Sequence, residues 1–181
     1  MSAEVWAKPL HERIERTSPL INARTARDYL DRALRPRLNG VIAPRAISQH
    51  VRVTSDGLQI IGGQIDQGRN PALAQLHVEG GGWITFSVTV EPTNEGLELR
   101  GYVFERVFPS EAHVRFIRFD LNPEGHANDT RELRSHMHPG HDDWMLPAPI
   151  LAPHELLHVM LTKFGARGER SERSKGRGTN S

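Results

Sequence analysis

Apolar residues recur with a helical period in the first forty residues of the chain. Between residues 6 and 14 they are spaced four apart, and between residues 26 and 34 they form an i, i+3, i+4, i+7, i+8 stripe. Both spacings are typical of amphipathic helices with one buried face. Pro36 is expected to end the second helix, because a proline lacks the amide hydrogen that a continuing helix needs. The sequence therefore predicts two helices in a helical N-terminal part, residues 1–40.

After this part the period changes to two. Apolar and polar residues alternate most clearly in residues 84–90, and turn sequences such as Ser55-Asp56-Gly57 separate the alternating segments. Alternation indicates strands with one buried face, and connections too short for a crossover helix make neighbouring strands antiparallel. We therefore predict an antiparallel meander sheet of five or six strands over residues 50–120.

Residues 121–150 follow neither period and are predicted to form a long His-rich loop. Irregular segments of this length are uncommon inside a compact domain and tend to carry function. A Leu-rich stretch that begins at Pro153 predicts a closing helix over residues 153–164, since proline is favoured at the first helical position. We therefore expect one α+β domain over residues 1–165, followed by a disordered basic tail, residues 166–181.

Composition excludes several classes of protein. The 181 residues include ten histidines and no cysteine, and the formal net charge is +1. Without cysteine the chain cannot form disulfides, thiolate-ligated zinc sites, iron–sulfur clusters or a thiol nucleophile. No apolar run approaches the roughly 20 residues of a membrane-spanning helix, and the N-terminal residues are charged where a signal peptide is apolar. We therefore expect a soluble cytoplasmic protein.

Six of the ten histidines lie near the C-terminus, and three of them fall in the segment from His136 to Asp142. If this segment begins as extended chain, His136 and His138 point to the same side, because side chains alternate along a strand. Imidazole and carboxylate suit a divalent metal such as zinc or manganese. The candidate metal ligands are His136, His138, His141 and Asp142. The alternatives are a hydrogen-bonded loop and imidazoles that act as acid and base without a metal.

A carboxylate precedes this segment at the end of the last predicted strand. Asp120 follows the strand residues 113–119 and is placed to act as a general base or to orient an imidazole. Its alternative role is in turn formation, since Asp and Asn-Pro sequences favour turns. The candidate catalytic residues are Asp120, His126, His136 and His138.

The H-E-L-L-H string at residues 154–158 matches the zinc-binding motif of zincin metalloproteases. In that motif two helical histidines bind the ion and the glutamate activates water. Pro153 places His154 in the first helical turn, where the positive end of the helix dipole disfavours a cation. We interpret the string as a coincidence of composition, and a zinc site shared between this helix and the His136 segment stays open.

The C-terminal half resembles a family of small bacterial toxins. Residues 113–164 combine an Arg-Phe-Asp strand end, an Asn-Pro and Gly-His loop, a His-x-His-Pro segment and a short Leu-rich helix, and this order is similar to that of the TumE-like toxins. The chain departs from the family in the leucine between Asp120 and Asn122, in a longer loop and in its N-terminal helical part. The resemblance implies a toxin or defence-associated protein that acts on RNA. The positions that it implicates are Asp120, His126, His136 and His138.

Two hypotheses for the function follow. The first is a hydrolase that cleaves a phosphodiester bond in RNA, with His136 and His138 binding a metal or acting as acid and base, and Asp120 orienting one of them. The second is a non-enzymatic interaction protein or accessory subunit in which the His-rich segment is structural. Its partner would be a protein such as an antitoxin or another subunit. The basic tail is predicted to add weak, salt-dependent contacts to nucleic acid.

Overall fold

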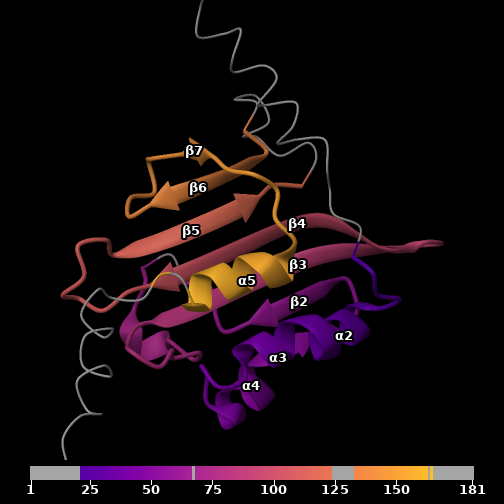
Figure 1. Ribbon diagram of the computed structural model, residues 1–181, viewed down its shortest axis with the longest axis horizontal. Helices are drawn as coiled ribbons and strands as arrows, with labels where there is room; N and C mark the ends of the chain where they lie inside the picture. Colours follow the sequence, from indigo (N-terminus) through magenta and orange to yellow (C-terminus); the bar gives the residue numbers. More distant parts are fainter. Residues whose placement is uncertain (1–20, 67, 124–132, 163, 165–181) are drawn as a thin grey trace, which may run out of the picture.

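The computed structural model describes residues 21–66, 68–123, 133–162 and 164. Within these ranges the chain forms an antiparallel sheet that carries helices on one face (Figure 1), and each strand pairs with the next in the chain. The strands are β1 (Val51–Val53), β2 (Gln59–Gly62), β3 (Trp83–Thr93), β4 (Gly96–Val107), β5 (Phe116–Leu121), β6 (Ser135–Pro139) and β7 (Leu146–Pro147). The helices are α2 (Ala26–Tyr29), the π-helical turn η1 (Leu30–Leu34), α3 (Arg35–Leu38), α4 (Pro44–His50), the 3-10 turn η2 (Pro71–Leu73) and α5 (Pro153–Thr162).

The fold is α+β with an antiparallel meander, as the sequence predicts, but the described part of the sheet has seven strands and not five or six. Two of the seven, β6 and β7, lie in residues 121–150, where we expected one long loop. In β6, buried histidines alternate with Ser135 and Met137, so its period of two does not show as an apolar pattern. The helix predicted over residues 6–14, His126 and the tail at 166–181 lie outside the described residues.

One helical segment spans residues 26–38 and continues past Pro36, where the sequence predicts its end. The π-helical turn η1 accounts for this difference, because the amide of Arg35 bonds to the carbonyl of Leu30, five residues earlier. Pro36 then lies in the first turn of α3, where an amide needs no intrahelical partner. Helix α4 is too short to show a helical period, and Ile47 is its buried residue.

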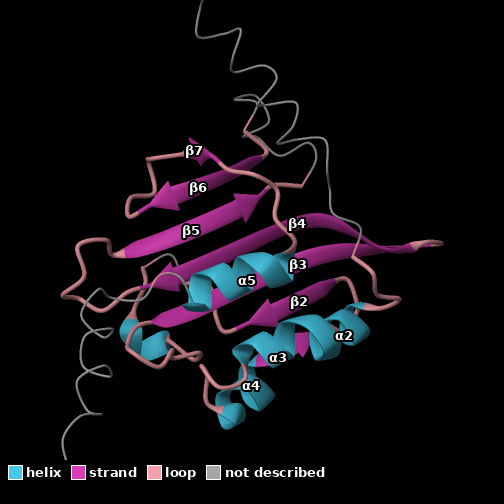
Figure 2. Cartoon of the chain, viewed as in Figure 1, coloured by secondary structure: helices cyan, strands magenta, loops and turns pink. Residues whose placement is uncertain are grey.

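The core lies between one face of the sheet and the helices (Figure 2). Phe86 of β3 stacks on its cross-strand neighbour Phe104 of β4, with ring centroids 5.3 Å apart. Gly62 of β2 pairs with Phe86, and a Cβ at this glycine would overlap the Phe86 ring. The helices contribute fully buried side chains to the same core, among them Leu30, Leu34, Leu156 and Leu157. None of the helices in the described ranges has the length and apolarity that crossing a membrane requires.

Helix α5 begins with a network of caps that involves two residues of the H-E-L-L-H string. The Tyr29 hydroxyl accepts a hydrogen bond from the His154 amide at 3.1 Å and lies 3.0 Å from His154 Nδ1, where it is placed to donate. Burial raises the pKa of Tyr29 above its ordinary value, so the hydroxyl keeps its proton. The carboxylate of Glu155 accepts from the Ala152 amide at 3.2 Å, as in a capping box.

Replacing Tyr29 by phenylalanine is expected to lower the free energy of unfolding by about 1–2 kcal/mol, because a helix-start amide and a ring nitrogen lose their partner. Urea denaturation followed by circular dichroism measures this change. His158, exposed on the same helix, provides the matched control, and His158→Ala is expected to shift stability by less than about 0.5 kcal/mol. A Tyr29→Phe variant as stable as the wild type would show that the cap contributes nothing.

Candidate metal centre

Strands β5 and β6 bring an aspartate and two histidines together. The two strands are antiparallel neighbours, and their register places Asp120 opposite His136 and Arg118 opposite His138. Side chains alternate along a strand, so these four residues share one face of the sheet, while Phe119 between Arg118 and Asp120 packs in the core. The polar face is therefore the one opposite the helices.

Three potential ligand atoms converge on this face. His136 Nε2 lies 3.4 Å and His138 Nε2 lies 3.2 Å from Oδ2 of Asp120. One ligand atom from each residue lies within 4.8 Å of the others, and the three residues are only 2% (His136), 3% (His138) and 7% (Asp120) exposed. A buried group of two imidazoles and one carboxylate in this geometry could hold a metal ion.

A backbone carbonyl determines which ring nitrogen of the neutral His136 carries the proton. Its Nδ1 lies 3.1 Å from the carbonyl oxygen of Leu133, which can only accept a hydrogen bond, so Nδ1 carries a proton. In the neutral ring Nε2 then has a free lone pair, and this lone pair faces Asp120. In histidines that ligate metals, the N–H of the second ring nitrogen commonly donates a hydrogen bond to a carbonyl or carboxylate in this way.

The ring of His138 is held differently. Its Nε2 faces Asp120 Oδ2 and also lies 2.9 Å from Nη2 of Arg118. A guanidinium only donates, so Nε2 accepts from Arg118 and the proton of the neutral ring lies on Nδ1. Nδ1 is buried and has no hydrogen-bond partner among the residues described. Two acceptors therefore face each other at 3.2 Å, with the Arg118 guanidinium beside them.

A chain of alternating charges extends from the cluster along the same face. Arg118 donates from Nε to Asp120 Oδ2 at 2.8 Å and from Nη1 to Asp142 Oδ1 at 2.6 Å. Arg69 donates to both oxygens of Asp142, at 2.7 and 2.8 Å, and to Oε2 of Glu105, at 2.8 and 3.1 Å. Three carboxylates thus surround two guanidinium groups. With neutral imidazoles the site carries a net negative charge, which favours a cation.

The backbone of Arg69 is in an uncommon conformation for this network. Its φ of 50° lies in the left-handed region, which side chains other than glycine rarely adopt. The guanidinium carbon lies 3.4 Å from the centre of the Phe116 ring, so the cation also stacks on an aromatic face of β5. Three contacts to distant parts of the chain therefore hold this residue, and they fasten the segment after β2 onto the polar face of the sheet.

The surroundings keep Asp120 ionised. Burial alone would raise its pKa, but the two imidazoles beside Oδ2 and the charge and hydrogen bond of Arg118 outweigh burial and hold the pKa well below its ordinary range. Glu105 shows the opposite balance, since burial raises its pKa in spite of Arg69. A carboxylate like that of Asp120 is a weak base and a good ligand or orienting group.

The structure separates the residues that the sequence analysis grouped together. It brings Asp120, His136 and His138 into contact. Asp142 lies one step away, with both oxygens bound by arginines. His141 is outside the cluster; its side chain is 63% exposed, and Nδ1 accepts from the Asp143 amide at 3.2 Å. His126 lies outside the described residues.

Three residues of the site were not singled out from the sequence. Arg118 carries a usable signal, because it stands two residues before Asp120 and therefore on the same face of β5. Glu105 also lies on this face, opposite Arg118 in the register of β4 and β5. Arg69 comes from an irregular segment, and no spacing in the sequence connects it to the cluster.

The zincin-like string takes no part in a metal site within the described ranges. His154 and Glu155 are engaged in the caps at the start of α5, and the group of potential ligands found there comprises Asp120, His136 and His138. The hydrogen bonds of a helix start therefore account for His154 and Glu155, while His158 is exposed.

Comparison with known proteins adds no identification. No family model, no curated protein and no solved structure matches the chain. The resemblance to TumE-like toxins stays an expectation that these comparisons do not test.

Proposed function

We propose that Asp120, His136 and His138 bind one divalent metal ion, and that the protein uses it to hydrolyse a phosphodiester bond in RNA. The observation that carries the proposal is the convergence of two imidazole nitrogens and one carboxylate oxygen in a buried site. Two histidines and a carboxylate on one side of an ion leave positions open for water and substrate. A bound ion of this kind lowers the pKa of a coordinated water to about 7 and so supplies hydroxide at neutral pH.

The ligand atoms narrow the choice of metal. The set holds nitrogen and oxygen and no sulfur, which suits zinc, manganese or iron(II) and disfavours copper(I). We propose zinc or manganese, because hydrolysis needs a Lewis acid and no change of oxidation state.

Arg118 connects the metal to an anionic substrate. The lone pair of His138 Nε2 cannot bind an ion and accept the Nη2 proton of Arg118 at the same time. An ion on this lone pair would take the acceptor away from Nη2, and because the guanidinium is planar and rigid, Arg118 would shift as a whole along Asp120 and Asp142. A free N–H donor then lies next to the metal, where it can bind a phosphate oxygen. This arrangement supports a phosphodiester as the substrate.

The metal content of the purified protein tests the proposal. Protein made without a histidine tag is expected to carry about one divalent ion per chain by elemental analysis, and His136→Ala/His138→Ala is expected to carry none, because three-ligand sites need each ligand. The matched control is His141→Ala/His158→Ala, which removes two exposed histidines outside the cluster and should retain the metal.

A wild-type protein that contains no metal and takes up neither zinc nor manganese would contradict the metal centre. In that case the cluster is a charge network, and the non-enzymatic interaction protein becomes the better interpretation. If the metal is present, cleavage of single-stranded RNA should require it and should stop on addition of EDTA. Metal binding without cleavage of RNA would restrict the proposal to the metal site.

A further inference from the structure

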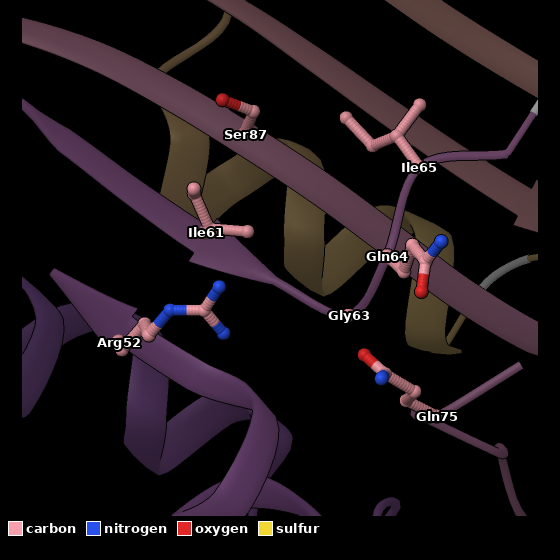
Figure 3. A pocket seen from close by; sticks show the side chains of 7 residues that line it. All are labelled: Arg52, Ile61, Gly63, Gln64, Ile65, Gln75 and Ser87. Atoms are coloured by element: carbon pink, nitrogen blue, oxygen red, sulfur yellow. The ribbon is translucent and has the colours of Figure 1, made fainter. Parts of the chain in front are cut away.

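A pocket of about 360 Å³ opens on the polar face of the sheet, away from the cluster. Figure 3 shows it beside β2 and β3, with α5 behind the sheet, so that it lies on the face opposite the helices. The residues that line it are Arg52, Ile61, Gly63, Gln64, Ile65, Gln75 and Ser87. Strands β1, β2 and β3 supply three of them, and the segments after β2 and before β3 supply the rest.

The pocket and the candidate metal centre belong to one row of cross-strand neighbours. Arg52 pairs with Ile61, Ile61 with Ser87, and Ser87 with Val103. Val103 pairs in turn with Asp120, and Asp120 with His136. Directly paired residues of an antiparallel sheet point to the same face. Strands lie about 4.8 Å apart, so Ser87 is about 10 Å and Ile61 about 14 Å from Asp120 along this row.

The lining of the pocket combines one positive charge, two carboxamides and apolar side chains. Its lining holds the guanidinium of Arg52 and no carboxylate, which favours an anion such as a phosphate. The carboxamides of Gln64 and Gln75 offer donors and acceptors, and Figure 3 shows the two side chains on either side of Gly63. Carboxamides can bind the edge of a base, and the isoleucine side chains offer apolar surface to its ring.

We propose that this pocket binds a nucleotide of the same single-stranded RNA whose phosphodiester reaches the metal centre. The proposal rests on the proposed function, since it makes the row from Ser87 to Asp120 the path of the substrate strand. Arg52 binds a phosphate, and Gln64 and Gln75 contact the base. The pocket then determines which phosphodiester is placed at the metal, because a nucleotide held about 10–14 Å away fixes the register of the strand.

Binding of a fluorescein-labelled single-stranded RNA of mixed sequence, followed by fluorescence anisotropy, tests the pocket. Arg52→Ala/Gln75→Ala is expected to raise the Kd about tenfold, a change that corresponds to about 1.4 kcal/mol. Its metal content is expected to equal that of the wild type. The control is Arg45→Ala, which removes an exposed arginine on α4 that does not line the pocket. It should leave the Kd within about twofold of the wild-type value, because the loss of one nonspecific phosphate contact changes the Kd by no more than this. If the double variant does not fold, the same measurement is made on Arg52→Ala, which changes only an exposed side chain.

The outcomes separate the pocket from the metal centre. RNA binding by Arg52→Ala/Gln75→Ala at the wild-type Kd overturns the pocket, whatever the metal content. A protein without metal whose RNA binding still depends on Arg52 supports the pocket and removes the hydrolysis. Displacement of the RNA by an acidic peptide as readily as by unlabelled RNA overturns the assignment to a nucleotide. Equal affinity for single-stranded DNA of the same sequence overturns the assignment to RNA.

Discussion

Replacing Arg69 by methionine is expected to lower the free energy of unfolding by about 3 kcal/mol at pH 7, because it leaves a buried carboxylate without its cation. The side chains of Arg69 and Glu105 are only 13% and 8% exposed, and Arg69 is the cation that contacts Glu105. Methionine retains an apolar stem that can pack on Phe116, so the change removes mainly the charge and its hydrogen bonds. Urea denaturation at pH 7 measures the difference.

The same variant is expected to regain stability as the pH falls. Burial raises the pKa of Glu105 above its ordinary value of 4.5 even with Arg69 present, and without Arg69 the pKa rises further. A raised pKa in the folded state gives stability that is fully present below pH 4.5 and is lost as the pH rises through the folded pKa. The gap between Arg69→Met and the wild type should therefore be largest at pH 7 and should narrow toward pH 4.5.

Two further variants isolate the buried pair. Adding Glu105→Gln to Arg69→Met removes the unpaired charge and should restore part of the lost stability at pH 7. Arg32 forms an i, i+4 ion pair with Asp28 on the surface, where its side chain is 80% exposed, and Arg32→Met should cost at most about 0.5 kcal/mol. A loss for Arg69→Met as small as this, or one that does not change with pH, would show that Arg69 does not neutralise Glu105.

The contact of Asp120 with His136 and His138 follows from the alternation of side chains along two strands. Once residues 135–139 are extended, His136 and His138 must share a face, and the strand before them carries Asp120 next to its last residue. What the apolar pattern could not supply is that β6 is a strand at all. Strands are recognised by an apolar face, and in β6 the buried positions that face Asp120 are histidines. Because the candidate ligands occupy these positions, the apolar pattern does not reveal the strand that carries them.

The ion pair of Glu105 and Arg69 could not be predicted from the sequence for a different reason. Glu105 reads as one of the polar positions in an alternating strand, where the expected environment is water. It is buried because Arg69, from a segment without periodicity, is placed above it by its own ion pairs. Contacts of this kind join residues that are far apart in the chain, and no local pattern records them.

Addition of zinc to protein freed of metal is expected to raise the melting temperature by about 5–10 °C. An ion present at a hundred times its Kd stabilises the folded state by about 2.7 kcal/mol, and each kcal/mol raises the melting temperature of a chain of this length by about 2–4 °C. The ligands come from two strands and are assembled only in the folded chain, so the unfolded state gains little from the ion. Thermal unfolding followed by circular dichroism, with EDTA added to reverse the shift, measures the effect.

The decisive quantity is the shift on adding metal and not the melting temperature itself, because removing a buried histidine also leaves a cavity. His136→Ala should lose the shift, whereas His141→Ala, which changes an exposed ring outside the cluster, should keep it. Zinc should reach the full shift at a lower concentration than manganese, since nitrogen-rich sites bind manganese more weakly. An equal shift in His136→Ala would place the bound ion elsewhere on the protein and would leave the buried cluster as a network of hydrogen bonds and charges.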